Sequence, residues 1–320
     1  MRILVTGAAG YIGSALTRFL ASQPDSEILA TDQGALAIGG PRIQAISGNL
    51  AYPKFARSLV MPGIDIVIHL ASLVSGGAEQ NFELGNKVNL DATRDLLEAC
   101  RLAGHCPKFV FTSSIAVYGE SPSEINDETP AAPRLSYGAQ KLVCEILIRD
   151  YTRRGYVDGR ALRLPAVLVR PGAANTAVSG WSSAIIREPL AGRDYVCPVR
   201  PDTRMACISL GRVVQSLAHA VTLSSEDLGS NRTVLLTGIP VSAQQMWDAV
   251  KDRAAGRVKF DPDPVLQKLM DAAPKATRSL RAAQLGFLHN KNIREIVVEY
   301  ESEKAEYEKT HSDTSVSRHG

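Results

Sequence analysis

The sequence predicts an α/β protein with a doubly wound parallel sheet and a smaller, irregular α/β domain that caps the sheet. Two observations predict this fold class. Across the first half of the 320-residue chain, short apolar runs alternate with helical patterns, which is typical of repeated β-α-β units. Several of these runs are apolar on both faces, as expected for parallel strands that helices cover on each side. Connections of this length predict right-handed crossovers.

The individual elements follow from the same periodicity. Strands are expected at residues 2–6, 28–31, 43–46, 65–70, 108–112 and 160–164, and helices at residues 11–22, 82–103 and 137–153. After residue 164, prolines and clustered glycines break this rhythm, so the chain becomes irregular. Ser242 and Gln245 form a predicted capping box, which begins a helix that reaches residue 255. The last ordered helix is expected at residues 293–300.

The composition excludes several classes of protein. Charged residues make up 22% and hydrophobic residues 45% of the chain, as in ordinary globular proteins, and the net charge is only +3. Such a small, scattered charge does not imply binding to nucleic acid or to a membrane surface. No apolar run reaches the roughly 18 to 20 residues of a membrane-spanning helix, and the N-terminus does not have the pattern of a signal peptide. The five cysteines include no Cys-x-x-Cys pair, so we expect no metal site and interpret them as reduced thiols of a cytoplasmic protein.

A glycine-rich turn directly follows the first expected strand. Gly7, Gly10 and Gly13 are spaced Gly-x-x-Gly-x-x-Gly, which departs from the more familiar Gly-x-Gly-x-x-Gly. We expect Gly7 to allow the tight turn, Gly10 to let the backbone approach a pyrophosphate, and Gly13 to let the helix pack closely on the sheet. The amides at the start of the helix would then face the phosphates. A glycine triplet alone could be an ordinary strand-to-helix turn, but this position favours a dinucleotide site.

An acidic residue at the end of the second expected strand supports the dinucleotide site. Asp32 follows Gly13 by roughly 20 residues, where a carboxylate binds the ribose hydroxyls of the adenosine and repels a 2′-phosphate. Because no arginine directly follows Asp32, NAD is favoured over NADP as the cofactor. The other interpretation is an aspartate in a turn at the end of a strand.

These observations divide the chain into three parts. Residues 1–165 are expected to form the NAD-binding domain, to which later segments return. Residues 166–301 are expected mainly to bind the substrate. Residues 302–320 are charged and polar, so we expect a disordered tail.

Tyr137 and Lys141 form the strongest pair of catalytic candidates. They are four residues apart in a predicted helix, so a phenol and an ammonium share one face of it. A phenol normally loses its proton near pH 10, but a nearby positive charge lowers that pKa and makes tyrosine a usable acid/base at neutral pH. The spacing alone also fits a solvated surface pair. The glycine turn and Asp32 favour the catalytic interpretation.

Five stretches occur together in a characteristic order: residues 6–13 (TGAAGYIG), 69–71 (HLA), 112–119 (TSSIAVYG), the pair Tyr137-x-x-x-Lys141, and 163–165 (RLP). In these stretches the chain resembles the extended short-chain dehydrogenase/reductase family, in its NAD-dependent epimerase/dehydratase branch. The resemblance implies a Rossmann fold and bound NAD. It also implies that Tyr137 is the acid/base, that Lys141 lowers its pKa and binds the nicotinamide ribose, and that Ser114 holds the reacting oxygen.

Further stretches narrow the resemblance to one subgroup. They are residues 73–76 (LVSG), 84–85 (LG), 136–141 (SYGAQK), 153–165 (RRGYVDGRALRLP), 170–172 (RPG), 186–192 (IREPLAG) and 197–198 (CP). These stretches are similar to the D-erythronate dehydrogenase-like subgroup, and several lie in the second half, where the substrate is chosen. The implied reaction is the NAD-dependent oxidation of the 2-hydroxyl of a small sugar acid, D-erythronate to 2-oxo-tetronate.

The resemblance also assigns binding residues. For the cofactor they lie in the glycine turn, at the ends of the following strands and beside the catalytic pair: Gly7, Gly10, Tyr11, Ile12, Gly13, Asp32, Asn49, Leu50, Leu70, Ala71, Ser72, Asn89, Tyr137, Lys141 and Pro165. Asn89 matches a position whose usual role is structural. For the substrate they are hydroxyl contacts and a cation for the carboxylate: Ser75, Ser114, Tyr137, Asn175, Arg187 and Arg204. Either arginine could instead be a surface salt-bridge partner.

Two departures from the family pattern bear on binding and reaction. Asn49 stands where the family usually has an aspartate that binds the adenine amino group, and its amide oxygen can still accept that hydrogen bond. Residues 114–117 lack the Asp-Glu pair that dehydratases place after the corresponding threonine, so dehydration is not expected.

Two other functions stay open on these grounds. A nucleotide-sugar 4-epimerase would use the same three catalytic residues with tightly bound NAD, although the second half shows no clear site for uridine diphosphate. A non-catalytic NAD-sensing scaffold would not need those three residues, and all three are present. The family also suggests a homodimer that packs the helices at 82–103 and 137–153 against a second copy.

Overall fold

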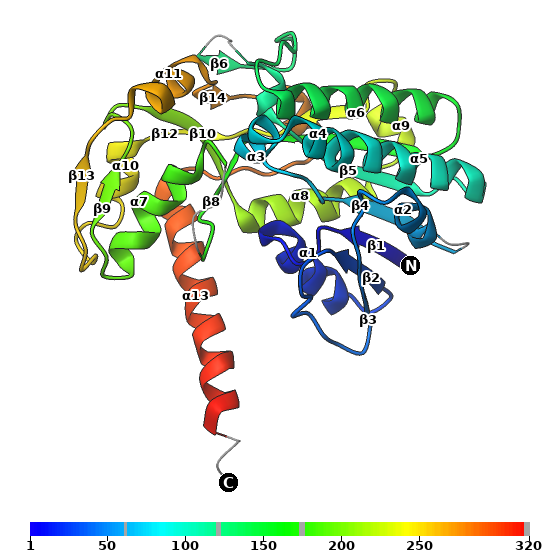
Figure 1. Ribbon diagram of the computed structural model, residues 1–320, viewed down its shortest axis with the longest axis horizontal. Helices are drawn as coiled ribbons and strands as arrows, with labels where there is room; N and C mark the ends of the chain where they lie inside the picture. The colour runs from blue at the N-terminus through cyan, green and yellow to red at the C-terminus, as the bar shows by residue number, and fades with distance from the viewer. Residues whose placement is uncertain (61–62, 120–122, 173–176, 317–320) are drawn as a thin grey trace.

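The computed structural model of the protein has a large sheet-based lobe and a smaller lobe at one side of it (Figure 1). The structure describes residues 1–60, 63–119, 123–172 and 177–316. For residues 306–316 it describes the backbone alone. The N-terminus lies at the edge of the large lobe away from the smaller one, and the C-terminal helix projects from the smaller lobe.

The central sheet has seven strands in the order β11-β7-β5-β4-β1-β2-β3, and all its pairings are parallel. Its members are β1 (Arg2–Thr6), β2 (Glu27–Asp32), β3 (Ile43–Ser47), β4 (Ile66–His69), β5 (Lys108–Ser114), β7 (Asp158–Leu164) and β11 (Thr233–Leu235). The strand order reverses beside β1, so a crevice opens at the carboxyl ends of β1 and β4. The predicted doubly wound sheet is therefore confirmed, and β11 brings a late segment back into it.

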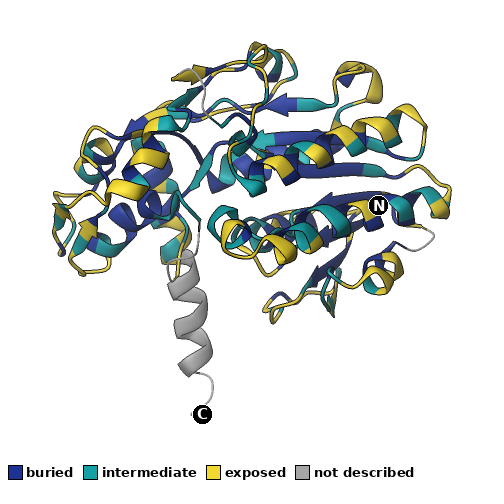
Figure 2. Cartoon of the chain, turned by 45° about the horizontal axis from the view of Figure 1, so that its top comes forward, coloured by how far each residue is buried: buried dark blue, intermediate teal, exposed yellow. Residues whose placement is uncertain are grey.

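Helices cover both faces of this sheet. On one face they are α1 (Tyr11–Ser22) and α8 (Leu210–Thr222), and on the other α2 (Pro53–Leu59), α5 (Ala92–Ala103) and α6 (Ser136–Arg153). Ile3 and Val5 of β1 pack toward α1 and α8, whereas Leu4 packs toward the other face. Figure 2 shows the strands as mostly buried. Cover on both faces explains why the strand sequences are apolar throughout.

The smaller lobe mixes short strands and helices. They are β8 (Ala166–Leu168), β9 (Tyr195–Cys197), β10 (Arg204–Ser209), β12 (Ile239–Ser242), β13 (Val258–Phe260), α7 (Gly180–Leu190), α10 (Ala243–Asp248), α11 (Pro264–Ala272) and α13 (Ile293–Val316). β10 pairs with β8 in parallel and with β12 in antiparallel, and β9 pairs with β13. Trp181, Ile185, Met246 and Ile296 belong to the core of this lobe. The mixed pairing accounts for the loss of the β-α-β rhythm.

Several short elements complete the fold. They are α3 (Ser75–Gln80), α4 (Phe82–Gly85), a π-helical turn (Asn86–Asp91), a 3-10 turn (Ile115–Val117), α9 (Ser225–Leu228), α12 (Leu280–Gln284), and β6 (Glu124–Ile125) paired with β14 (Ala276–Thr277). The single helix expected at 82–103 is therefore wrong in detail, because a π-helical turn interrupts it. The β6–β14 pair ties the segment before α6 to the segment after α11.

One helix of the smaller lobe begins as predicted but ends early. Ser242 Oγ accepts a hydrogen bond from the Gln245 amide at 3.1 Å, and Gln245 Oε1 accepts one from the Ser242 amide at 2.9 Å, so the capping box is confirmed. α10 nevertheless ends at Asp248 rather than at residue 255. The chain then continues in turns, in which the Val250 amide donates to the Trp247 carbonyl.

The C-terminal helix is longer than the sequence predicts. Ile296, Val297 and Tyr300 anchor its first turns in the core of the smaller lobe. The backbone then stays helical to Val316. We expected a disordered tail from residue 302, whereas the structure has a helix there as far as residue 316. Residues 317–320 lie outside the described residues. Glutamate and lysine are good helix formers, which accounts for the helix continuing beyond these apolar first turns. Within the described chain, neither α13 nor another helix is long and apolar enough to cross a membrane.

Candidate active site

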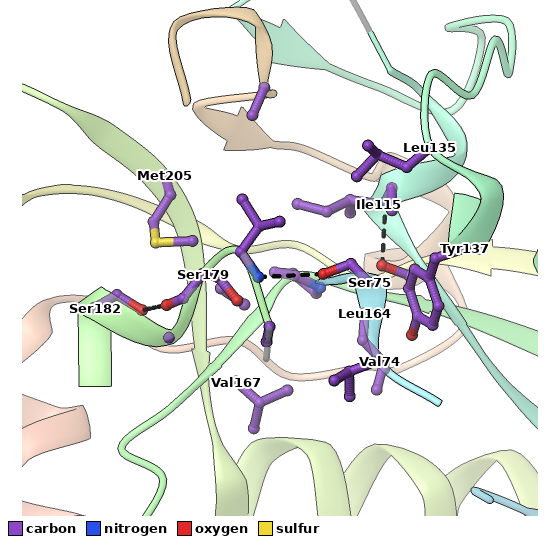
Figure 3. Close-up of a pocket in the computed structure, with 18 of the residues that line it drawn as sticks. Val74, Ser75, Ile115, Leu135, Tyr137, Leu164, Val167, Ser179, Ser182 and Met205 are labelled. Atoms are coloured by element: carbon purple, nitrogen blue, oxygen red, sulfur yellow. Dashed lines mark hydrogen bonds between the residues drawn. The ribbon is translucent and has the colours of Figure 1, made fainter. Parts of the chain in front are cut away.

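A cavity of about 1200 Å³ lies between the carboxyl ends of the central strands and the smaller lobe. The large lobe lines it with the glycine turn, the segments after β4 and β5, and the first turns of α6, and the smaller lobe lines it with β8, α7 and α11. Figure 3 shows Tyr137 and Ile115 on one side of this cavity and Ser179 and Met205 on the other. The cavity therefore lies in the crevice that the reversal of strand order opens.

The glycine turn is packed so tightly that two of its positions exclude any side chain. Gly7 has φ +71°, and a Cβ there would lie 2.7 Å from the Ala71 amide nitrogen. A Cβ on Gly13 would lie 2.0 Å from the Gly7 carbonyl oxygen. Gly10 is less confined, since its Cβ would lie 3.1 Å from the same oxygen, and it lines the cavity. The tight turn expected at Gly7 and the close packing expected at Gly13 agree with these distances, and the role of Gly10 stays a prediction.

The first turn of α1 is open to an anion. No side chain of the described residues caps this helix and no acidic residue lies in its first turn. Tyr11, Ile12 and Gly13, whose amides begin the helix, all line the cavity. Free amides at a helix N-terminus form an anion site. This turn therefore fits the pyrophosphate of a dinucleotide.

Asp32 lies beside the glycine turn at the end of β2. Its Oδ2 accepts a hydrogen bond from the Ala9 amide at 3.0 Å, and its Oδ1 accepts one from the Gly34 amide at 2.9 Å. The Oδ1 of Asn49 accepts from the Ala51 amide at 2.8 Å, and Leu50 is buried beside it. None of Asp32, Asn49 and Leu50 lines the cavity of the catalytic pair. Their contacts to adenosine stay a prediction, for which the Asp32 and Asn49 side-chain oxygens each keep a lone pair.

Tyr137 and Lys141 lie on the same face of α6, as their spacing predicts, and both line the cavity. Lys141 is only 2% exposed. Its ammonium donates a hydrogen bond to the Thr112 carbonyl at 2.8 Å and lies 5.5 Å from the centre of the Tyr137 ring. It also lies 4.5 Å above the ring of Phe111. The pair is therefore not a solvated surface pair.

The pKa of Tyr137 differs from the expectation. Burial raises the pKa of this phenol to about 12, and hydrogen bonds with Ser72 and Ser114 only partly oppose that effect. Burial also lowers the pKa of Lys141 to about 8. Burial, which disfavours the charged form of each group, is thus the largest influence on both pKa values, and the activation of Tyr137 by Lys141 stays a prediction.

Ser114 ends β5 and contacts the same phenol. Its Oγ accepts a hydrogen bond from the Ala116 amide at 3.1 Å, which begins the 3-10 turn. Because that bond uses a lone pair, the hydroxyl hydrogen is left for Tyr137 or for an oxygen of a ligand. Ser114, Tyr137 and Lys141 are thus brought together from two neighbouring elements.

Asn89 is a buried hub behind the catalytic tyrosine. Its Oδ1 accepts hydrogen bonds from Ser72 Oγ at 2.9 Å and from the Leu73 amide at 2.7 Å. Its Nδ2 donates to the Leu73 carbonyl at 3.0 Å and to Gln140 Oε1 at 2.7 Å. Asn89 does not line the cavity. It therefore joins the segment after β4 to α6, which agrees with a structural role.

We expect Asn89→Ala to destabilise the protein by about 3 kcal/mol, because several buried partners lose their hydrogen bonds at once. Denaturant unfolding of both proteins measures this change. Asn231→Ala is the control, since that exposed side chain accepts one bond from the Thr233 amide. Equal free energies of unfolding for Asn89→Ala and the control would show that the hydrogen bonds of Asn89 do not stabilise the fold.

A second buried network holds the turn after β4, and the sequence gives little sign of it. His69 bonds Thr6 Oγ1 at 2.7 Å and Thr93 Oγ1 at 3.0 Å through its two ring nitrogens. Burial lowers the pKa of His69 to about 3, so the ring is neutral and structural. Thr6 Oγ1 also accepts from the amides of Leu70 and Ala71. Leu70 and Ala71, which are predicted to contact the cofactor, therefore lie in a segment whose backbone is held by the buried Thr6 side chain.

A buried ion pair supports the β5 side of the site. Arg163 binds both carboxylate oxygens of Glu145 and the hydroxyl of Tyr118. Glu145 also accepts a hydrogen bond from Ser113 at 2.5 Å. Glu145 lies on α6 one turn after Lys141, so this network ties the catalytic helix to β5 and β7.

Only some of the residues predicted to bind the substrate line the cavity. Ser75 lines the cavity, and its Oγ accepts a hydrogen bond from the Val178 amide at 3.2 Å, which links the two lobes (Figure 3). Pro165 also lines the cavity. Asn175 lies outside the described residues.

Neither predicted arginine is free to meet a substrate. Arg204, the first candidate for the substrate carboxylate, is exposed and lies in a separate depression beside Asp202, outside the cavity. β10 begins at Arg204, and only the next residue, Met205, reaches the cavity, since side chains alternate along a strand. Arg187 does line the cavity, but its guanidinium is bound by Glu188 and by the Arg170 carbonyl.

One wall of the cavity was not predicted. α11 and the residues after it contribute Val265, Lys268, Leu269 and Pro274, more than 120 positions after Tyr137 along the chain. Val265 is 74% exposed although it is apolar. No motif marks this segment, and its spacing fits an ordinary amphipathic helix.

The fold and this site together define a dinucleotide-dependent α/β enzyme of the tyrosine–lysine type. The sequence profile described as "NAD dependent epimerase/dehydratase family" matches residues 3–202. The chain therefore belongs to the NAD-dependent epimerase/dehydratase family, and its cofactor is NAD. This confirms the resemblance and the cofactor that the motifs predict.

The relatives narrow the family further. D-erythronate dehydrogenase of Cupriavidus necator is 39% identical over 316 residues, which cover 94% of this chain and 98% of that protein. D-erythronate dehydrogenase of Haemophilus influenzae is 37% identical over 310 residues, with 94% and 98% covered. The crystal structure of a nucleoside-diphosphate-sugar epimerase from Agrobacterium tumefaciens is similar at a TM-score of 0.86 and 35% identity, covering 93% of this chain and 92% of that one.

Proposed function

We propose that the protein oxidises the 2-hydroxyl of a small sugar acid, D-erythronate, to the 2-oxo acid with NAD. The single observation that carries this proposal is the meeting of Tyr137, Lys141 and Ser114 beside the glycine turn in one cavity. The two D-erythronate dehydrogenases, similar over nearly their full lengths, support the substrate.

The chain's own residues would handle the proton of the reaction. The substrate hydroxyl would lie between Ser114 and Tyr137, where Ser114 donates a hydrogen bond to its oxygen and the ionised Tyr137 accepts its proton. Bound NAD supplies the hydride acceptor. Lys141, held by the Thr112 carbonyl, keeps a positive charge beside the phenolate. The apolar walls of Ile115, Leu135 and Leu164 exclude water around these groups.

The pH dependence should follow the ionisation of Tyr137. Because burial raises its pKa to about 12, its reactive form is scarce at neutral pH and increases as protons are removed. Between about pH 6 and about pH 8 we expect kcat/KM to rise nearly tenfold per unit, since the rate follows the ionised fraction of the base. The rise should flatten above about 8, where Lys141 loses its proton. A stopped-flow or steady-state pH profile measures this, and a flat profile would contradict the assigned base.

The substrate carboxylate needs a cation in the smaller lobe. Lys268 on α11 lines the cavity and is exposed, and within the described residues its ammonium has no hydrogen-bond or ion-pair partner. We assign it to the carboxylate in place of Arg204 and Arg187. An ammonium on a long, flexible stem suits a small substrate, because it can follow the carboxylate into the cavity.

The experiment that tests the proposal is a panel of four- to six-carbon sugar acids with NAD or NADP, followed by NADH or NADPH absorbance. We expect turnover with D-erythronate and NAD, and weak or no turnover with NADP because Asp32 repels a 2′-phosphate. A second candidate is a nucleotide-sugar 4-epimerase, which the Agrobacterium relative favours. That function would interconvert nucleotide sugars without net NADH, and such an outcome would overturn the proposal.

We also propose a homodimer formed through α4, α5 and α6. Phe82, Val143 and Ile146 are apolar and 62%, 40% and 50% exposed on this face. The predicted result is a dimer by light scattering at micromolar concentration, which the double variant Val143→Glu, Ile146→Glu converts to a monomer because charges oppose burial. Val298→Glu, on the exposed side of α13, is the control and should stay dimeric. A monomeric wild type would contradict the interface.

The compartment that fits this function is the cytoplasm. All five cysteines are free, and Cys100, Cys144, Cys197 and Cys207 are buried. Burial raises the pKa of each of these thiols, which keeps them protonated and unreactive. Free thiols in this number support a reducing compartment.

A further inference from the structure

Five basic side chains line the cavity: Arg134, Lys141, Arg170, Arg187 and Lys268. Lys141 and Arg187 are committed to the contacts already described, and Arg134 also has an interaction partner. In the part of the chain that the structure describes, the guanidinium of Arg170 has no hydrogen-bond or ion-pair partner. A half-buried guanidinium on the wall of a cavity is a ready binding site for an anion.

The backbone of Arg170 is held in place from three sides. Its amide donates to Ser183 Oγ at 3.0 Å, and its carbonyl accepts from Arg187 Nη1 at 2.7 Å. The carbonyl of the preceding residue, Val169, accepts a hydrogen bond from the Tyr11 hydroxyl at 3.0 Å. Arg187 therefore positions Arg170 rather than facing a ligand itself. The segment is pre-organised, so binding an anion would cost little ordering of the backbone.

Tyr11 brings this segment to the glycine turn. It is the first residue of α1, and it lines the cavity together with Gly10 and Ile12. Burial and the carboxylates of Glu303 and Glu299 raise the pKa of Tyr11, whereas the Arg170 guanidinium acts in the opposite direction. The positive charge of Arg170 therefore lies within electrostatic range of the start of α1.

We propose that Arg170 binds the pyrophosphate of NAD from the side of the smaller lobe, opposite the free amides of the first turn of α1. A guanidinium can bind two phosphate oxygens at once, which neutralises charge that the glycine turn leaves uncompensated. Tyr11 is a positioning residue, because its hydroxyl ties Val169 to the turn. The inference rests on the assignment of the glycine turn as the pyrophosphate site.

Among the described residues, two cations of the cavity have no hydrogen-bond or ion-pair partner, and this assignment gives them to two different ligands. Arg170 follows β8 and neighbours the glycine turn through Tyr11, whereas Lys268 lies on α11 at the wall that the C-terminal segment forms. Arg170 should therefore affect the cofactor, and Lys268 the sugar acid. A bound pyrophosphate would also join the two lobes, since α1 and Arg170 belong to different ones.

The test is equilibrium binding by calorimetry, with NAD, ADP-ribose and adenosine as probes. For Arg170→Met we expect the Kd of NAD and of ADP-ribose to rise roughly 10- to 100-fold, as for loss of a charge-assisted hydrogen bond, with little change for adenosine. Arg170→Lys should lose part of this affinity, because a single ammonium cannot bind in a bidentate manner. Tyr11→Phe should raise both Kd values by a smaller factor.

Lys268→Met is the matched control. It removes the other free cation of the cavity, so the Kd of NAD and ADP-ribose should stay within about twofold while KM for D-erythronate rises. If Arg170→Met binds ADP-ribose like the wild type, the proposal is overturned, and a selective rise in KM would reassign Arg170 to the substrate. Failure of the wild type to bind ADP-ribose would instead refute the glycine turn as the pyrophosphate site. Circular dichroism verifies folding, and Arg170→Lys carries the test if Arg170→Met does not fold.

Discussion

Tyr137→Phe is expected to lower kcat for D-erythronate oxidation at least about a thousandfold, since a positioned acid/base typically contributes 10²- to 10⁴-fold. The Kd of NAD should stay within about twofold, because the phenol oxygen contacts Ser72 and Ser114 and not the glycine turn. Steady-state kinetics and calorimetry measure these two quantities. A phenyl ring of the same size avoids a cavity, so the fold should be retained.

Tyr156→Phe is the control for this variant. Its hydroxyl accepts a hydrogen bond from Arg154 on the surface and Tyr156 does not line the cavity, so its removal should leave kcat within about twofold. Retention of a tenth or more of the wild-type kcat by Tyr137→Phe would exclude tyrosine as the base. Loss of NAD binding by the same variant would show that the phenol holds the cofactor.

Gly13→Ala is expected to destabilise the protein by about 3 kcal/mol and to raise the Kd of NAD at least about 100-fold, as overpacking against rigid backbone does. The added Cβ would lie 2.0 Å from the Gly7 carbonyl oxygen and 2.8 Å from the Ala8 Cα. Gly7 cannot retreat, because it packs in turn against the backbone of Leu70 and Ala71. The first turn of α1 must therefore shift, and its amides lose their geometry.

Gly39→Ala is the matched control, since no atom lies within 4 Å of a Cβ there and its φ is not positive. Its stability should stay within about 0.5 kcal/mol of the wild type. Thermal unfolding and calorimetry measure both variants. Normal NAD binding by Gly13→Ala would mean that the helix N-terminus does not hold the pyrophosphate.

Much of the site near Tyr137 and Lys141 could be predicted because it depends on residues that are close together in the sequence. The spacing of Tyr137 and Lys141 decides that they share a helix face, and a glycine at position 7 is needed where φ is +71°. Alternating apolar runs decide the strands in the same way. Each of these conclusions depends on neighbours within a few residues, so the sequence pattern carries it.

The features of the site that differ from the expectations depend on distant contacts. Arg204 lies outside the cavity and Met205 lines it, because the packing of the smaller lobe decides which face of β10 meets the cavity, and no local pattern indicates that face. Arg187 forms an ion pair with its neighbour Glu188. Its hydrogen bond to the Arg170 carbonyl, which the sequence does not indicate, shows that its guanidinium holds the backbone of Arg170. The pKa of Tyr137 is raised by burial, which depends on the tertiary packing around the phenol.

By itself the sequence determined the parallel sheet, the tight glycine turn with Asp32 beside it, the shared helix face of Tyr137 and Lys141, and the family. These features need particular residues at fixed spacings, so short-range geometry specifies them. Only the tertiary structure decided which cations face the cavity, that α11 closes it, and that Arg170 lies beside the glycine turn. Those facts arise from segments more than 100 residues apart along the chain, and only folding brings such segments into contact.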